Sequence, residues 1–327
     1  MSFDRRLHDR YIQAMNVTQF CSFLLLLVPV YGIVNNVRPI IGVLAQESDY
    51  NDLEYGDTYI SADYFQYIEM AGARAVPVFV RKDDEYYSKM VQSLNGILFP
   101  GGDVGLISSY MAKAAQAIYK QAIETNDAGH YFPLWGTCQG FQLLTALTAG
   151  KNLLTNASAE DVALPLDFVN GFRSSRLYGS LPADIYEYLS TMNVTENFHH
   201  YGITPETMEL TDSLYSFYNI LSTNLDVHGK RFVSSFEAKH YPFYGTQFHP
   251  EKVSFQWNTN YHINHGPEAI KVGQYFANFL VAEARKSDNH FAAESDEISA
   301  MIENYQPVFI RDNTYRLTYF FNYTSTP

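Results

Sequence analysis

The sequence contains very little cysteine: Cys21 and Cys138 are the only two among 327 residues. A disulfide-rich scaffold is therefore excluded, because such scaffolds depend on several cysteine pairs. Cys21 lies in an apolar run, residues 20–34, so removal of that run would leave Cys138 as the one thiol. A lone free thiol is a liability in an oxidising pathway. We therefore expect Cys138 to have a chemical role, with a buried structural cysteine as the alternative.

Basic residues are also scarce. The chain has 22 lysines and arginines against 35 aspartates and glutamates, and its net charge is −13. This balance argues against nucleic-acid binding, because phosphate recognition needs a basic face. The ten histidines would offset much of the negative charge at acid pH, since an unperturbed histidine titrates near pH 6.5. The 46% content of hydrophobic residues predicts an ordinary packed core.

Long apolar runs are absent apart from residues 20–34. That run is about 15 residues long, short of the roughly 20 that a membrane-spanning helix needs. Val30 and Gly32 follow its centre at the spacing of a signal-peptidase site. We predict a signal peptide over residues 1–34, with an uncleaved anchor and a buried strand as the alternatives.

Three glycosylation sequons agree with passage through the secretory pathway. They lie at Asn156, Asn193 and Asn322, and each asparagine would be a surface acceptor there.

Apolar runs and helical patterns alternate through the first half of the remaining chain. This alternation predicts one α/β domain over residues 35–327, a three-layer sandwich with a mostly parallel central sheet and helices on both faces, as in flavodoxin-like folds. The second half indicates partly antiparallel strands, mixed loops and short helices over 151–215, and a tail from residue 300 without a clear pattern. The predicted strands are residues 39–46, 73–80, 95–103, 131–136, 217–225, 231–238 and 241–248, and the predicted helices are 59–73, 83–93, 107–124, 139–147 and 268–286.

The segment WGTCQGFQ, residues 135–142, joins a predicted strand to a predicted helix with Cys138 at the turn. A side chain at such a turn points outward, and flanking glycines let the turn close without Cβ clashes. The helix N-terminus favours a thiolate. The backbone N–H of Gln139 would then point towards an oxyanion. The pattern indicates a cysteine nucleophile.

A Gly-Gly turn ends the preceding predicted strand, in FPGGD at residues 99–103. Parallel sheets bind ligands at the carboxyl ends of their strands. We therefore expect a backbone N–H of Gly101 or Gly102 to complete an oxyanion hole, with an ordinary turn as the alternative.

A histidine and a glutamate lie two residues apart in GTQFHPEKV, residues 245–253. On an extended chain, residues at this spacing face the same side. A carboxylate beside an imidazole fixes its tautomer and stabilises the imidazolium, as in a catalytic triad. His249 and Glu251 are therefore candidate catalytic residues, and a surface turn is the alternative.

Together these motifs resemble the class I glutamine amidotransferase superfamily, and more closely the γ-glutamyl hydrolases, which are secreted or lysosomal hydrolases of folate polyglutamates. The resemblance implies a class I glutamine amidotransferase-like fold. It also implies Cys138 as nucleophile, His249 as general base and acid, and Glu251 as orienting carboxylate. The similarity covers residues 38–290 through RPIIGVLAQ, AGARAVPV, NGILFPGG, YFPLWGTCQGF, NFHHY, YGTQFHPEK and NFLVAEARKS.

The resemblance further implies substrate contacts at His199, in NFHH, and at Gly101. Four residues after the cysteine, vertebrate-type γ-glutamyl hydrolases are expected to have glutamate, whereas this chain has Gln142. Glutamine at that place is usual in amidotransferases. Gln142 therefore leaves the substrate preference open.

The implied activity is cysteine-dependent hydrolysis of γ-glutamyl amide bonds in folyl poly-γ-glutamates, as an omega peptidase without a metal or organic cofactor. Two alternatives stay open: a glutaminase or other γ-glutamyl amide hydrolase, and a catalytically inactive secreted relative that acts as a binding protein. We expect a small-molecule substrate, no nucleic-acid partner, no stable membrane span in the mature chain and a secreted or lysosomal location, and we allow for a homodimer. Candidate cations for the anionic substrate are Lys239, Lys252, Arg173 and Arg176.

Overall fold

The central sheet of the protein has eight strands, of which five in a row run parallel. The computed structural model describes residues 36–49, 52–311 and 315–323, so the predicted signal peptide and Cys21 lie outside the described residues. In spatial order the strands are β4 (Arg74–Val78), β1 (Ile40–Leu44), β5 (Ile97–Phe99), β6 (Leu134–Thr137), β12 (Phe243–Thr246), β11 (Arg231–Ala238), β10 (Tyr218–Leu225) and β8 (Asp167–Phe168). The last three of these join the sheet antiparallel.

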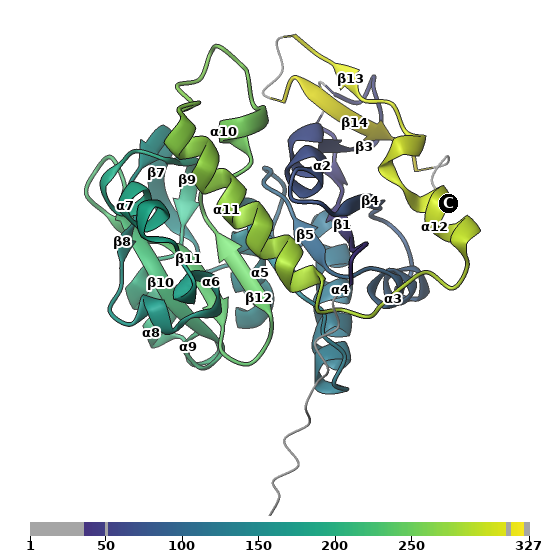
Figure 1. Cartoon of the computed structure of the whole chain (residues 1–327), viewed down its shortest axis with the longest axis horizontal. Coiled ribbons are helices and arrows are strands. Elements are labelled where there is room, and N and C mark those ends of the chain that lie inside the picture. The colour runs from purple at the N-terminus through teal and green to yellow at the C-terminus, as the bar shows by residue number, and fades with distance from the viewer. Residues whose placement is uncertain (1–35, 50–51, 312–314, 324–327) are drawn as a thin grey trace, which may run out of the picture. The chain divides into compact units, whose positions relative to one another are not determined.

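Alternate side chains of these strands enter two separate cores, one on each face of the sheet. Ile41 and Val43 of β1 pack into one core, whereas Ile40 and Leu44 pack into the other. Figure 1 shows helix α11 (Pro267–Ala284) lying across one face of the sheet, which is called the first face below. The first face is covered by α2 (Ala62–Glu69), α7 (Ala183–Thr191) and α11 (Pro267–Ala284), and the second by α3 (Asp84–Ser93), α4 (Tyr110–Asp127), α5 (Gln139–Ala149), α8 (Pro205–Leu210) and α9 (Asp212–Phe217).

Two smaller sheets flank the central one. The first has the order β13 (Val308–Phe309), β14 (Leu317–Phe321), β3 (Thr58–Ser61) and β2 (Gln46–Glu47), so the C-terminal strand lies beside a strand near the start of the domain (Figure 1). The second pairs β7 (Thr155–Leu164) with β9 (Thr195–Gly202). The short helices are η1 (Phe172–Ser174), α6 (Arg176–Gly179), α10 (Lys252–Phe255), α12 (Glu294–Ala300) and η2 (Ile302–Asn304).

The predicted α/β class, with a mostly parallel sheet and helices on both faces, is confirmed. The predicted helix over residues 59–73 is wrong at its start, because residues 58–61 form β3 and the helix begins at Ala62. Pairing of β3 with β14, more than 250 residues away, overrides the local helical pattern. The long β7–β9 pair within 151–215 was not predicted. Within the described part of the chain, no helix is both long enough and apolar enough to cross a bilayer.

Strands β5, β6 and β12 are neighbours in the sheet and run parallel. Their carboxyl ends therefore meet at one edge, and the three motifs that follow them, FPGGD, TCQG and FHPE, are brought together there.

Candidate active site

Cys138 occupies the sharp turn between β6 and α5. Its φ of +50° and ψ of −105° are unusual for a residue with a side chain, and such backbone strain is concentrated at functional sites. The neighbouring glycines are sterically required: a Cβ on Gly140 would lie 1.9 Å from the carbonyl oxygen of Phe99, and one on Gly136 would lie 2.6 Å from the backbone of Gly140. The turn therefore has the geometry expected for a nucleophile between glycines.

The Cys138 thiol is buried, with 5% of the residue exposed, and its Sγ lies 3.7 Å from the carbonyl oxygen of Phe198. Burial, with a smaller effect of Glu251, raises the pKa of the thiol to about 12, although Lys252 and the backbone N–H of Gln139 act in the opposite direction. Burial thus outweighs the effect expected of the helix N-terminus. The resting thiol is neutral and needs a general base.

His249 and Glu251 form a buried pair after β12. Nδ1 of His249 lies 2.6 Å from Oε1 of Glu251, and both residues are at most 2% exposed. Burial lowers the pKa of His249, although the carboxylate raises it in part. Burial alone would raise the pKa of Glu251, but His249 and Lys252 hold it below its usual value. Neutral histidine therefore donates from Nδ1 to an ionised carboxylate, which leaves Nε2 as a proton acceptor.

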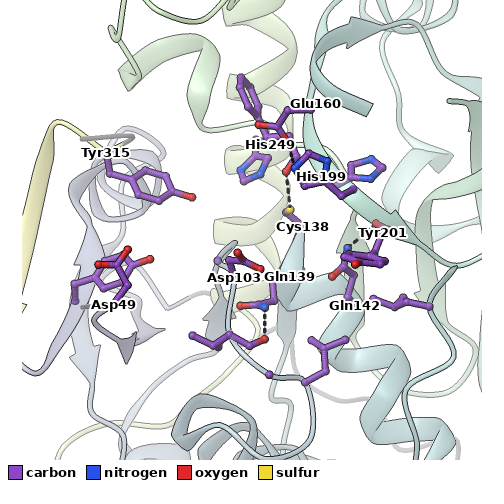
Figure 2. Close-up of a pocket in the computed structure, with 18 of the residues that line it drawn as sticks. Asp49, Asp103, Cys138, Gln139, Gln142, Glu160, His199, Tyr201, His249 and Tyr315 are labelled. Carbon is purple, nitrogen blue, oxygen red and sulfur yellow. Dashed lines mark hydrogen bonds and ion pairs between the residues drawn. The ribbon is translucent and has the colours of Figure 1, made fainter. Parts of the chain in front are cut away.

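Gly101 lies between the cysteine and the histidine. A Cβ on this glycine would be 2.6 Å from Cε1 of His249 and 3.3 Å from Cβ of Cys138. Its backbone N–H donates to the hydroxyl of Tyr64 over 2.7 Å, and that hydroxyl is 3.5 Å from Nδ1 of His249. The close packing around Gly101 brings Cys138 and His249 into one site. Figure 2 shows these two side chains near each other in the pocket.

Gly102 and Gln139 carry the backbone N–H groups predicted for an oxyanion hole. Within the described residues the N–H of Gly102 has no hydrogen-bond partner, whereas that of Gly101 is taken by Tyr64. The N–H of Gln139 lies close enough to the sulfur to favour its charged form. Gln46 holds the glycine turn in place, because its Nε2 donates a hydrogen bond to the carbonyl oxygen of Gly101 over 2.9 Å. The arrangement leaves Gly102, rather than Gly101, for an incoming oxygen.

His199 is buried in β9, with 4% of the residue exposed, and lines the same pocket as Cys138. Its Nε2 lies 3.3 Å from Oδ1 of Asn197, and its ring meets Phe232 edge-on. Burial, followed by the nearby His249, lowers the pKa of His199 to about 3. The ring is therefore neutral, and it can serve as a hydrogen-bonding group but not as a cation.

Gln142 lies on the first turns of α5 and also lines the pocket. Its Nε2 donates to the carbonyl oxygen of Tyr201 over 2.8 Å and to Oε1 of Gln247 over 3.3 Å. A backbone carbonyl only accepts, so this bond orients the amide and leaves Oε1 of Gln142 to face the pocket. A glutamine held in this way offers an acceptor oxygen, whereas an ionised glutamate could not donate to Tyr201 and Gln247.

The pocket above Cys138 has a volume of about 580 Å³, within the range of small-molecule sites. Figure 2 shows Tyr315 and Asp49 on one side of Cys138, and Gln142 and Tyr201 on the other. Its charged lining is mostly acidic. The acidic residues are Asp49, Asp52, Asp103 and Glu160, and the aromatic ones are Tyr59, Phe198, Tyr201, Tyr261 and Tyr315.

Of the four predicted cations, only Lys252 lines this pocket. Arg173 lies over the rings of Phe172 and Tyr186, and Arg176 donates to a backbone carbonyl at the edge of the sheet. Lys239 is exposed. The prediction is therefore corrected for these three residues, because nearness in sequence to a motif does not place a side chain in its pocket.

The remaining predicted sites lie on the surface. Asn156 in β7, Asn193 before β9 and Asn322 after β14 are exposed. Glycosylation at these residues stays a prediction. Across the described ranges, no three His, Cys, Asp or Glu side chains are grouped so as to hold a metal ion.

Sequence reasoning missed Gln46, Tyr64 and Tyr315. Gln46 stands at the carboxyl end of the predicted strand 39–46, so the ligand-binding rule for parallel sheets contained a signal for it. Tyr64 has no such signal, since its helical spacing is that of a core residue. Tyr315 reaches the pocket from the C-terminal tail, which has no local pattern.

The chain is similar to a known protein family, to curated proteins and to solved structures. The family model described as Peptidase C26 matches residues 39–251. Gamma-glutamyl hydrolase of Homo sapiens is 42% identical over 274 residues, with 83% of this chain and 86% of that protein covered. Gamma-glutamyl hydrolase B of Dictyostelium discoideum is 38% identical over 297 residues, with 90% and 85% covered. Among solved structures, PurLQS from Thermotoga maritima has a TM-score of 0.47 and 16% identity, with 74% of this chain and 99% of that chain covered.

Proposed function

The chain belongs to the peptidase C26 family, and from this premise we infer that it is an enzyme that hydrolyses γ-glutamyl bonds. We further propose Cys138 as the nucleophile, His249 as the general base and acid, and Glu251 as the carboxylate that orients the imidazole. The observation that carries this assignment is that Gly101 packs against both Cys138 and His249. The hydrogen bond between His249 and Glu251 supports the role of the carboxylate.

In the proposed reaction, Nε2 of His249 takes the thiol proton while Sγ of Cys138 attacks the carbonyl carbon of the γ-glutamyl amide. The lowered pKa of His249 keeps the ring neutral and able to act as a base at neutral pH. The oxyanion accepts hydrogen bonds from the N–H groups of Gly102 and Gln139. His249 then protonates the leaving nitrogen, and the C–N bond breaks to leave a γ-glutamyl thioester. Water activated by His249 hydrolyses the thioester and restores the thiol.

We propose folyl poly-γ-glutamates as the substrate class. The pocket is large enough for a small-molecule ligand, and its aromatic side chains suit a flat ring system. No metal or organic cofactor takes part in the proposed steps.

A glutaminase is the second candidate. Gln142 occupies the position at which γ-glutamyl hydrolases are expected to have glutamate and amidotransferases usually have glutamine. The NH₂ group of Gln142 donates to Tyr201 and Gln247, which leaves its oxygen as an acceptor. An ionised glutamate could not donate to these two oxygens, so the bonds that hold the side chain require the amide. They hold Gln142 itself, however, and give no physical reason to prefer glutamine as the substrate.

The two candidates are separated by incubating the purified chain with a pteroyl-polyglutamate and with glutamine, at acid and at neutral pH. We expect mass analysis to show shortened polyglutamate chains, and Cys138→Ala to abolish the activity. Turnover of glutamine alone would favour the glutaminase. Turnover of neither substrate, or full activity in Cys138→Ala, would contradict the proposed mechanism.

We also propose that the chain passes through the secretory pathway to a secreted or lysosomal location. The exposed asparagines of the three sequons support this proposal. Expression in a secreting cell should yield a glycoprotein whose mass falls on treatment with an N-glycosidase, and an unchanged mass would contradict it. Light scattering of the same sample measures whether the chain forms a homodimer.

A further inference from the structure

Lys252 is a buried lysine beside the catalytic pair. It follows Glu251 directly and is the first residue of α10. Only 2% of it is exposed, yet its side chain lines the pocket together with Cys138 and His249. A lysine is almost never fully buried unless it is paired, so its partner is of interest.

Within the described part of the chain, the ammonium group of Lys252 has aromatic neighbours but no carboxylate in direct contact, although the charge of the adjacent Glu251 acts on it from farther away. Its Nζ lies 4.9 Å from the ring centre of Phe198 and 4.6 Å from that of Tyr315. Among the described residues, Nζ donates no hydrogen bond and has no carboxylate oxygen within 4.0 Å. The two rings offset part of the cost of burying the charge, but they leave the three N–H donors unused. The site formed by the described residues therefore lacks a hydrogen-bond acceptor for this buried cation.

Among the described residues that line the pocket, Lys252 is the one lysine or arginine. The acidic side chains of the pocket include Asp49, Asp103 and Glu160. An anionic group that enters the pocket thus has a single full cation to bind. The charge of Lys252 acts on both Cys138 and His249, which shows that it is near the reacting atoms. A carboxylate bound there would lie next to the bond that is cleaved.

Every γ-glutamyl amide carries such a group. Its α-carboxylate is attached to Cα, and Cα is three bonds from the carbonyl carbon under attack. We propose that the ammonium group of Lys252 binds the α-carboxylate of the γ-glutamyl residue whose amide bond is cleaved, and thereby selects γ-glutamyl bonds over other amides. This inference rests on the proposed function and adds a substrate-binding residue to it.

The test compares two substrates that differ only at the α position: a γ-glutamyl anilide with a free α-carboxylate, and the same compound with an α-carboxamide. We expect the wild-type enzyme to prefer the acid. Lys252→Met keeps the length of the side chain without its charge. It should lower the ratio of kcat/KM for the acid to kcat/KM for the carboxamide by about 100-fold, the effect typical of an unpaired buried charge, because any change in the reactivity of Cys138 or His249 affects both substrates alike.

Lys239→Met is the matched control. Lys239 also lies over a tyrosine ring, at 4.7 Å from the centre of Tyr215, but it is exposed and outside the pocket. Its replacement should leave the preference for the acid unchanged. Circular dichroism establishes whether each variant is folded.

A second measurement is independent of turnover. Iodoacetate and iodoacetamide alkylate the same thiol, but only iodoacetate carries a carboxylate. Their rate ratio on Cys138 therefore reports the local cation, even if the thiol itself becomes more or less reactive. We expect the ratio to fall in Lys252→Met and to stay constant in Lys239→Met.

An unchanged ratio, or a folded Lys252→Met enzyme that still prefers the acid, would overturn the inference. So would a wild-type enzyme that cleaves the acid and the carboxamide equally, in which case the proposed hydrolase activity would stand. If the wild-type enzyme cleaves neither substrate, the proposed function fails, and the alkylation ratio still decides the role of Lys252.

Discussion

Replacing Gly101 with alanine would place a methyl group between the proposed nucleophile and base. The added Cβ would lie 2.6 Å from Cε1 of His249 and 2.8 Å from the hydroxyl of Tyr64, where ordinary contact begins at 3.4 Å. The imidazole or the glycine turn must therefore move by about 0.8 Å. A misplacement of roughly 1 Å in a catalytic group costs about 100-fold in rate, so we expect kcat/KM to fall by about that factor.

The assay is steady-state hydrolysis of a γ-glutamyl anilide, with thermal unfolding measured in parallel. Gly179→Ala is the control, because its added Cβ would lie 3.3 Å from the carbonyl oxygen of Arg173 and far from any proposed catalytic group. We expect this control to retain its activity. A folded Gly101→Ala enzyme with unchanged kcat/KM would show that Cys138 and His249 do not act across Gly101.

Two further substitutions test the site, and a third tests the stability contribution of Glu196, a buried residue of β9. Glu251→Gln removes the carboxylate that raises the pKa of His249, so the acid limb of the kcat/KM profile should move to lower pH and kcat should fall, by up to about 10⁴-fold; an unchanged pH profile would refute this role. Burial raises the pKa of Glu196 from 4.5 to about 7. Because the folded protein resists ionisation of this carboxyl, the free energy of unfolding falls as pH rises from about 4.5 to about 7. Glu196→Gln should therefore raise the free energy of unfolding in urea at pH 8, by an amount on the order of 2 kcal/mol, but not at pH 4, and equal effects at both would refute it. Tyr64→Phe removes the acceptor for the N–H of Gly101 and should lower kcat by roughly tenfold, whereas full activity would show that this bond does not position the turn.

The parts of the site that could be predicted from the sequence are those carried by short segments. The turn around Cys138 needs glycines on both sides. His249 and Glu251 are only two residues apart, so their side chains meet, although the chain there turns after β12 and is not extended as predicted. Each pattern is complete within a few residues, because the steric or electrostatic requirement behind it is local. The order of the central-sheet strands and their helices in the first half was predictable for the same reason, whereas β3 was not.

The parts that could not be predicted depend on contacts between distant segments. Tyr315 and Phe198 reach Lys252 from the C-terminal segment and from β9, more than 50 residues away in each direction. Pairing with β14 likewise turns residues 58–61 into a strand. The burial that raises the pKa of Cys138 also arises from the whole fold, so the helix N-terminus alone indicated the wrong direction.

If Cys138 attacks the substrate and forms a thioester, intact-protein mass spectrometry of enzyme quenched in acid during turnover should detect that thioester. We expect an adduct with the mass of the γ-glutamyl acyl group on the peptide that contains Cys138, and no such adduct on Cys138→Ala. An actively turning-over Cys138→Ala enzyme, or an acyl adduct on a different residue of the wild-type chain, would contradict this mechanism.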